Sequence, residues 1–195
     1  MATSRTIDVN WTIPLLATCD VCVVGGGSAG IAASVAAARA GAKTILIERY
    51  GFLGGTSTAG MVGPFMTSYS ADGRERIIAG VFQELVDRMV KLGGAIDPST
   101  TKPNSKWTAY IELGHSNVTP FSVEACKLAA LELTEEAGVD TWYHTSFVKA
   151  QVAGRTITGV VVHNKGGLGL IEARTIVDCS ADADVAANAG VPFRM

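Results

Sequence analysis

The sequence predicts an α/β fold with a parallel sheet, helices on both faces and a small antiparallel β-meander. Three observations lead to this prediction. A valine-rich run at 20–25, an alanine-rich helix pattern and a second apolar run at 43–48 follow one another, which is the order of a β-α-β unit. From residue 141 onward, short runs of high β-propensity lie close together, which favours antiparallel strands. Apolar residues make up 48% of the 195 residues and charged residues 17%, a balance that is typical of a buried core.

The first β-α-β unit is the clearest element of the sequence. Its first strand, 20–25, is a short apolar run that ends in glycine, as expected of a strand buried on both faces. A helix over 28–40 consists largely of alanine, whose small side chain allows close packing on the sheet, and Gly41 ends it. The second strand covers 43–48. We expect the crossover between the two strands to be right-handed.

The remaining elements are predicted from local patterns. Residues 49–73 are rich in glycine, serine and threonine and predict an irregular loop. Helices are expected over 74–92, where apolar residues recur every three or four positions, and over 123–137. A loop with one strand at 107–113 separates them. The later elements are expected to be strands at 141–152, 156–164, 169–173 and 174–180, with the last one returning to the main sheet, and a short helix at 184–189.

Charge and hydropathy exclude several classes of partner. The formal charge is −2 and the basic residues are scattered singly, so no basic stripe is available to bind nucleic acid. The N-terminus lacks the basic start and long apolar run of a signal peptide. No stretch approaches the roughly 18 uncharged apolar residues of a membrane span. We expect a soluble, cytoplasmic protein that binds a small-molecule substrate and contacts neither nucleic acid nor membrane.

Two cysteines with CxxC spacing, Cys19 and Cys22, precede the glycine-rich turn. Such a pair in a redox motif opens a helix, whereas this one leads into a strand. Residues three apart on a regular strand point to opposite faces, so both thiols are interpreted as packing residues. No second Cys or His pair completes a zinc site, and no metal is expected.

The pattern G-x-G-x-x-G, formed by Gly25, Gly27 and Gly30, lies where the first strand meets the first helix. The first glycine permits the tight turn, the second lets the backbone approach a pyrophosphate, and the third lets the helix pack closely on the sheet. The helix N-terminus then presents N–H groups and a partial positive charge to the phosphates. The context of strand, turn and helix makes this pattern specific.

An acidic residue at the end of the second strand strengthens the prediction. Seventeen residues separate Gly30 from Glu48, which is close to the spacing at which an acid reaches the ribose hydroxyls of a dinucleotide. The motif alone does not distinguish NAD from FAD. The next segment offers Gly54, Gly55 and three hydroxyl residues, where an NAD dehydrogenase usually continues into a helix. Bare backbone and hydroxyl groups at this place favour a longer ligand.

From Asp20 onward the chain resembles the FAD-dependent oxidoreductases of the glutathione-reductase-like superfamily. Within it, the chain is most similar to the large bacterial group known only as FAD-dependent oxidoreductases. The resemblance rests on DVCVVGGGSAGIAAS, LIERYGFLGGTSTAG, EACKLAALELTEEAGV and RTIVDCSADADVAANAGVP. It implies a Rossmann-like FAD-binding domain, FAD as cofactor and oxidoreductase activity.

The resemblance also implies a role for particular residues. Glu48 would bind the adenosine ribose, with Arg49 beside it, and the backbone near Phe147 would pair with adenine. No histidine lies near Thr56, where members with covalent flavin attach it, so a non-covalent flavin is implied. The pyrophosphate contacts would come from Gly25, Gly26, Gly27, Ser28, Ala29 and Gly30, and the contacts along the pyrophosphate and ribityl chain from Gly54, Gly55 and Thr56.

The segment after the last strand corresponds to the family's second signature, where Ala-Thr-Gly-Asp is usual. This chain has Cys179, Ser180, Ala181 and Asp182 instead, and the last three are predicted cofactor contacts. A methyl group at Ala181 would crowd a phosphate contact that glycine allows. Asp182 and Asp184 are interpreted as a cofactor contact and a helix-start charge rather than as a metal pair.

We expect one FAD-binding domain, 1–195, that is incomplete. Its core would comprise 20–60 and 140–195, with a helical and loop insertion at about 61–139 and no substrate domain. A C-terminal half or a partner subunit would complete the site. The catalytic residues stay unknown, and His115 is the histidine considered as a candidate.

Three hypotheses for function remain open at this point. The first is the N-terminal FAD-binding part of an oxidoreductase that transfers hydride between FAD and a small molecule. The second is a non-catalytic FAD- or nucleotide-binding subunit that serves as a scaffold. The third is an NAD-dependent dehydrogenase domain.

Overall fold

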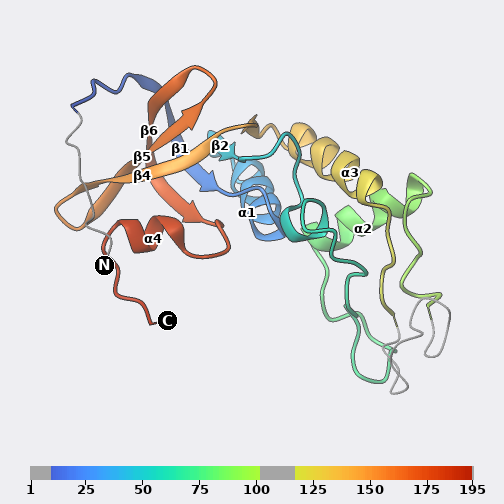
Figure 1. Ribbon diagram of the computed structural model, residues 1–195. Coiled ribbons are helices and arrows are strands. Elements are labelled where there is room, and N and C mark those ends of the chain that lie inside the picture. The colour runs from blue at the N-terminus through green and yellow to red at the C-terminus, as the bar shows by residue number, and fades with distance from the viewer. Residues whose placement is uncertain (1–9, 102–116, 195) are drawn as a thin grey trace, which may run out of the picture.

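The computed structural model describes residues 10–101 and 117–194, in which six strands form one sheet with the order β3-β2-β1-β6-β5-β4 (Figure 1). Four neighbours, β3, β2, β1 and β6, run parallel, and β6, β5 and β4 continue the sheet antiparallel. The fold is therefore the predicted mixture of a parallel sheet and an antiparallel meander. The strands are β1 (Leu15–Val24), β2 (Thr44–Ile47), β3 (Asp140–Trp142), β4 (Ser146–Ala153), β5 (Thr156–Asn164) and β6 (Gly167–Asp178).

Helices cover the parallel part of the sheet unequally. Three helices lie together to one side of the parallel strands, and the short α4 lies on the side of the meander (Figure 1). Among the described residues, no helix is both long enough and apolar enough to cross a membrane. The helices are α1 (Ser28–Arg39), α2 (Val81–Lys91), α3 (Val123–Glu136) and α4 (Asp184–Asn188), with a single 3-10 turn, η1 (Gly55–Ser57).

Alternation along β1 and β2 divides the core into two clusters. Val23 and Leu46 face α1, α2 and α3. They pack against buried side chains of these helices, such as Val35 of α1. Val24 and Ile47 face the opposite way and pack with side chains of β4, β5, β6 and α4. The second face of the parallel strands is thus covered mainly by the meander. Strands buried on both faces explain the continuous apolar runs in the sequence.

The helix predicted over 74–92 begins seven residues later, at Val81. Gly80 adopts a φ of +63°, which interrupts helical geometry immediately before α2. Upstream, the chain forms a hairpin-like turn in which Ser70 N–H donates to the Glu75 carbonyl at 2.7 Å. The apolar spacing of Ile77 and Ile78 fitted a helix, but both side chains are exposed. Tertiary contacts, rather than periodicity, decide where this helix starts.

Strand boundaries near the meander also differ from the prediction. The run 141–152 is broken between β3 and β4, because His144 has a φ of +50° and Thr145 N–H donates to the Glu48 carbonyl at 2.9 Å. Conversely, the strands predicted at 169–173 and 174–180 form one strand, β6, since no turn residue separates them. The predicted strand at 107–113 and His115 lie outside the described residues.

The prediction that Cys19 and Cys22 point to opposite faces is wrong. The N–H groups of Asp20 and Val21 both donate to the Lys43 carbonyl, at 2.9 and 3.2 Å, which is the pattern of a β-bulge. The extra residue shifts the alternation of side chains between the two faces of the sheet by one position. Both thiols therefore lie in the same core cluster on the meander side, where they are buried.

Candidate functional site

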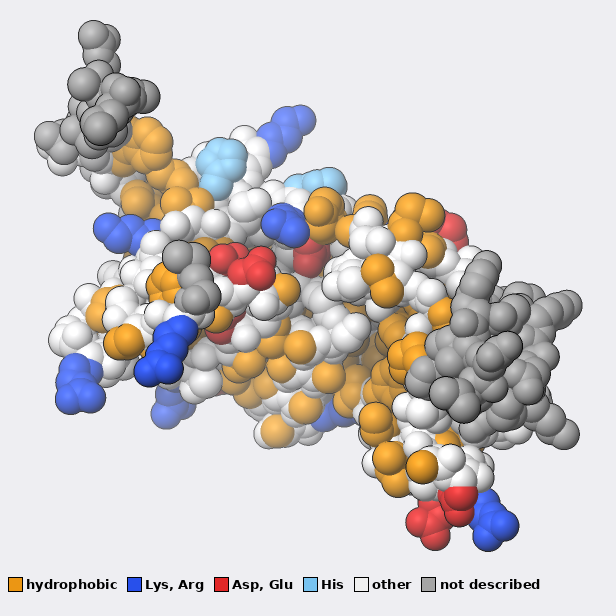
Figure 2. All heavy atoms as spheres, turned by 60° about the horizontal axis from the view of Figure 1, so that its bottom comes forward, with side chains coloured by type: hydrophobic (Ala, Val, Ile, Leu, Met, Phe, Trp, Pro, Cys, Tyr) orange, Lys and Arg blue, Asp and Glu red, His pale blue; other side chains and the backbone are white. Residues whose placement is uncertain are grey.

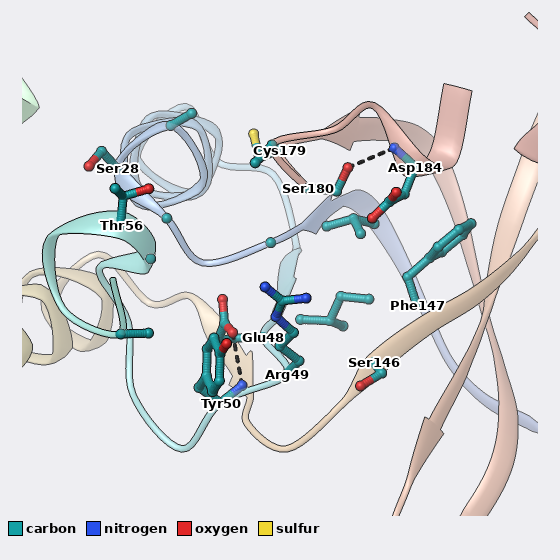
Figure 3. Close-up of a pocket in the computed structure, with 18 of the residues that line it drawn as sticks. Ser28, Glu48, Arg49, Tyr50, Thr56, Ser146, Phe147, Cys179, Ser180 and Asp184 are labelled. Atoms are coloured by element: carbon teal, nitrogen blue, oxygen red, sulfur yellow. Dashed lines mark hydrogen bonds between the residues drawn. The ribbon is translucent and has the colours of Figure 1, made fainter. Parts of the chain in front are cut away.

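A cavity of about 620 Å³ opens at the carboxyl ends of β2, β1 and β6. Parallel α/β sheets bind ligands at this edge, and the volume is typical of a ligand pocket. The walls come from the segments that follow these three strands, together with the loop after β2 and the start of β4. Figure 3 shows Ser28 and Thr56 at one end, Glu48 and Arg49 along one side, and Phe147 and Asp184 at the other end.

Two glycines of the first turn are required by packing within the protein. Gly25 has a φ of +100°, and a Cβ there would lie 2.4 Å from the carbonyl oxygen of Cys179. A Cβ at Gly30 would lie 1.8 Å from the carbonyl oxygen of Gly25. Both contacts are too short for any side chain. These residues therefore let β1, β6 and α1 approach one another, as the sequence pattern predicts.

Gly27 is different, because no contact among the described residues explains it. Its φ of −71° suits any residue, and a Cβ built there would find its nearest neighbour, Cα of Gly55, 3.9 Å away. Gly27 lies in the cavity wall beside Ser28 and Ala29, at the start of α1. The first N–H groups of a helix have no partner within the helix and carry partial positive charge. The bare backbone and these N–H groups together form a cradle for an anion.

Glu48 lies in the cavity wall directly after β2 and is only 5% exposed. Its Oε2 accepts a 2.7 Å hydrogen bond from Gly26 N–H, and its Oε1 accepts a 2.8 Å hydrogen bond from Tyr50 N–H. Each carboxylate oxygen can accept a further bond. The two backbone bonds fix the orientation of the carboxylate and leave acceptor capacity for hydroxyl groups in the cavity.

The second glycine pair packs directly on the first turn. Gly54 N–H donates to the Gly26 carbonyl at 2.8 Å, and Gly54 has a φ of +113°. A Cβ at Gly55 would lie 2.9 Å from Cα of Gly27. Thr58 supports the loop from behind, since its hydroxyl donates to the Leu53 carbonyl at 2.7 Å. This close approach extends the bare-backbone cradle from the first turn into the loop after β2.

The segment after β6 is organised around the carboxylate of Asp178. Its Oδ1 accepts bonds from the N–H and hydroxyl of Ser180, and its Oδ2 accepts bonds from the N–H groups of Val185 and Ala186. Partial burial acts to raise the pKa of Asp178, but these hydrogen bonds outweigh burial and lower the pKa below its ordinary value. The carboxylate therefore ties the strand end to α4.

Two alanines in this segment adopt the left-handed region. Ala181 has a φ of +79° and Ala183 a φ of +58°, a region that costs an L-residue about 1–2 kcal/mol. Ala181 occupies the position at which the second signature usually has glycine, and it lines the cavity. Asp182, a predicted cofactor contact, lies outside the cavity wall, whereas Asp184 lies in that wall; both residues are exposed.

The structure brings most of the predicted residues together. Gly26, Gly30 and Gly54 lie behind the cavity wall, where they support it through the contacts described above. The predicted residues that line the cavity are Gly25, Gly27, Ser28, Ala29, Glu48, Arg49, Gly55, Thr56, Phe147, Ser180 and Ala181.

Several residues of the wall were missed. Val24 and Ile47 end β1 and β2, so the rule that ligands bind at the carboxyl ends of parallel strands could have identified them. Asp184 gave no such signal, because its place depends on the backbone conformation of the two residues before α4. The others are Tyr50, Ala59, Gly60, Thr145, Ser146 and Cys179.

Comparison with known proteins agrees with this geometry. The sequence model of a family described as FAD dependent oxidoreductase matches residues 20–195. No protein with a curated description matches the sequence.

Several solved structures have a similar fold. L-proline dehydrogenase from P. horikoshii is 15% identical with a TM-score of 0.60, and the match covers 93% of this chain and 58% of that one. A geranylgeranyl bacteriochlorophyll reductase-like protein from Thermoplasma acidophilum is 20% identical with a TM-score of 0.56, over 91% of this chain and 44% of that one. The myxobacterial chondrochloren halogenase CndH, an FAD-dependent halogenase, is 17% identical with a TM-score of 0.55, and the match covers 83% of this chain and 37% of that one. The chain thus spans less than two thirds of these proteins, and the likeness concerns the fold.

Proposed function

The chain belongs to the family of FAD dependent oxidoreductases, and we propose that it is the FAD-binding part of an enzyme that transfers hydride between FAD and a small organic substrate. FAD is the cofactor of this family, and the residues of the cavity fit it. The observation that carries the proposal is the open backbone at Gly27, where an added Cβ would have its nearest neighbour, Cα of Gly55, 3.9 Å away. A glycine that packing does not require is explained by a ligand that approaches the backbone.

The order of groups along the cavity matches the order of groups in the adenosine half of FAD. The N-terminus of α1, with Ser28, would hold the pyrophosphate through N–H groups and the helix dipole. Glu48 would accept hydrogen bonds from the ribose hydroxyls, since its carboxylate is already oriented by Gly26 and Tyr50. Phe147 and its neighbours at the start of β4 would hold the adenine. Gly55 and Thr56 would continue the contact toward the ribityl chain.

When bound, the flavin ring supplies the redox chemistry by accepting or returning a hydride at N5. The part played by this chain would be to bind and orient the dinucleotide. We assign no described residue to the catalytic step. The substrate and the electron acceptor would be bound by other residues of the enzyme.

We further propose that a second domain or a partner subunit completes the reaction site. Ala59 and Gly60 line the cavity, and the chain that follows them exposes large apolar side chains, including Met61 at 77% and Val62 at 56%. Figure 2 shows hydrophobic side chains gathered over the projecting loops on this side of the molecule. Contiguous apolar surface of this kind is typical of a covered face.

The proposal is tested by flavin content after purification with added FAD. The wild-type protein should be yellow with a flavin absorption band, and Gly27→Val should lose the flavin while its far-UV circular dichroism and unfolding midpoint stay close to wild type. Gly30→Ala is the matched contrast, because the clash with the Gly25 carbonyl oxygen should destabilise the fold itself. Unchanged flavin content in Gly27→Val would refute this binding mode.

A second experiment separates an enzyme from a non-catalytic FAD-binding scaffold. The polypeptide would be expressed together with any coding sequence downstream of residue 195, and the bound flavin followed by its absorption under anaerobic conditions. Bleaching of the flavin band by members of a panel of amines, alcohols and hydroxy acids supports an oxidoreductase. If chemical reductants bleach the flavin band but no substrate of the panel does, the result favours a non-catalytic scaffold.

A further inference from the structure

The end of the cavity farthest from the start of α1 has the character of a purine site. Val24 and Ile47 line the cavity at the ends of β1 and β2, although both are packed in the core and only 3% and 1% exposed. Phe147 contributes an aromatic ring from β4. A purine is a flat ring with apolar faces and polar edges, so the aromatic ring of Phe147 suits one of its faces. The identity of the base must then be recognised by polar groups at the edge of the cavity.

Asp184 is the acidic group at this end of the cavity. Its carboxylate is turned into the cavity on the side of Phe147 (Figure 3). The backbone beneath it is held in place: Asp184 N–H donates to the Ser180 hydroxyl at 2.8 Å, and the next residue, Val185, is buried and donates to Asp178. Among the hydrogen bonds of residues 10–101 and 117–194, none ends on the Asp184 carboxylate. The backbone of Asp184 is thus held in place, and its exposed carboxylate has acceptor capacity that the described chain leaves unused.

We propose that Asp184 selects adenine by accepting a hydrogen bond from its exocyclic amino group. The inference rests on the proposed FAD-binding function and adds a residue that sets base specificity. A carboxylate at neutral pH accepts hydrogen bonds and donates none. Adenine presents an amino donor at C6, whereas hypoxanthine and guanine present a carbonyl acceptor there. A carboxylate that faces the C6 substituent therefore favours adenine, which donates there, over a 6-oxopurine, whose carbonyl oxygen it repels.

Asp182 provides the control that the chain itself offers. It lies two residues away and carries the same side chain; both aspartates are exposed, but only Asp184 lines the cavity. If the effect came only from negative charge near the cofactor, neutralising either aspartate would change the base preference. Base selection by direct contact would be altered only at Asp184.

The experiment compares FAD with its deaminated analogue, flavin hypoxanthine dinucleotide, in which a carbonyl group replaces the amino group at C6 and N1 carries a proton. Dissociation constants would be measured from flavin fluorescence for the wild type, Asp184→Asn, Asp184→Ala and Asp182→Asn. The wild type should prefer FAD by about tenfold, a preference within the range for a single well-placed base contact. Asp184→Asn should reduce the preference to about twofold or reverse it, because an amide can also donate to a carbonyl oxygen.

Asp184→Ala should reduce the preference without reversing it, and Asp182→Asn should keep the wild-type ratio. Similar unfolding midpoints would show that all variants fold. A wild type that binds both dinucleotides equally, or an Asp184→Asn variant that keeps the full preference, would overturn the inference while leaving FAD binding intact. If the wild type binds neither dinucleotide, the proposed function fails and base selection fails with it.

Discussion

The backbone N–H of Gly26 donates a 2.7 Å hydrogen bond to Oε2 of Glu48. This bond joins the turn after β1 to the residue that ends the second strand of the β-α-β unit. Gly26 also accepts a bond from Gly54 N–H at 2.8 Å, so three segments of the cavity wall meet at one residue. Glu48 therefore has a structural role in addition to its proposed role as a ribose ligand.

Replacing Glu48 should consequently affect both stability and binding. Glu48→Ala leaves the N–H groups of Gly26 and Tyr50 without their acceptor, and we expect the free energy of unfolding to fall by about 1–3 kcal/mol. FAD affinity should fall by about 1.5–3 kcal/mol if the charge-assisted ribose bond is also lost. Urea unfolding of the apoprotein and FAD titration measure the two effects separately. Glu75→Gln, an exposed glutamate on the projecting loop, should change neither.

Ala181→Gly should stabilise the protein. Its φ of +79° costs alanine about 1–2 kcal/mol, and the greater freedom of glycine in the unfolded chain offsets about 0.4–1 kcal/mol of the gain. We expect a net increase of about 0.5–1 kcal/mol in the free energy of unfolding, measured by thermal or urea denaturation. Ala36→Gly, in the exposed middle of α1, should lower it by a similar amount. A drop in stability for Ala181→Gly would contradict the strained conformation.

Asp178→Asn should destabilise the connection between β6 and α4 in a pH-dependent way. Hydrogen bonds lower the pKa of Asp178 below its ordinary value of 3.8, so folding favours the ionised form. Its contribution is complete above the unfolded pKa and is lost as the pH falls through the lowered folded pKa. At pH 7 the variant should be about 1–2 kcal/mol less stable than wild type, and this difference should shrink below pH 4. Urea midpoints from pH 7 to pH 3 check the trend; a difference that grows in acid would have the wrong sign.

Cys179 should be the thiol through which cofactor binding can be followed. It lines the cavity and is partly exposed, whereas Cys19, Cys22 and Cys126 are buried. Burial, and secondarily the charge of Asp178, raises the pKa of Cys179 above its ordinary value of 9.0. Labelling by a thiol reagent should therefore be slow at pH 7 and faster above pH 9, because the thiolate is the reactive form.

Saturating FAD should protect Cys179 from this labelling, and denaturant should be needed to expose the other three thiols. Peptide mass mapping after timed labelling identifies each site. If FAD left the labelling rate of Cys179 unchanged, the cofactor would not cover this part of the cavity wall.

Features that depend on neighbouring residues were predictable from the sequence. The strand, turn and helix at 20–40 follow from an apolar run, three glycines at fixed spacing and an alanine-rich segment. The same pattern places Glu48 at the end of the next strand, and the structure brings it to the turn. Strand propensity likewise predicted the meander, although not that β6 serves both the parallel and the antiparallel parts of the sheet.

Features that depend on contacts between distant residues were not predictable. A bulge paired with Lys43 places Cys19 and Cys22 on one face, and a left-handed Gly80 delays the start of α2.

The sequence by itself determined the β-α-β unit and the glycine cradle, because both follow from the conformational preferences of adjacent residues. Only the tertiary structure decided which of the two aspartates at the start of α4, Asp182 or Asp184, lines the cavity. That choice rests on the left-handed backbone at Ala181 and Ala183, on the bonds from Asp178 to the start of α4 and on the position of Phe147 on β4. Strained backbone angles and contacts with a separate strand leave no local sequence pattern, and folding alone brings such groups together.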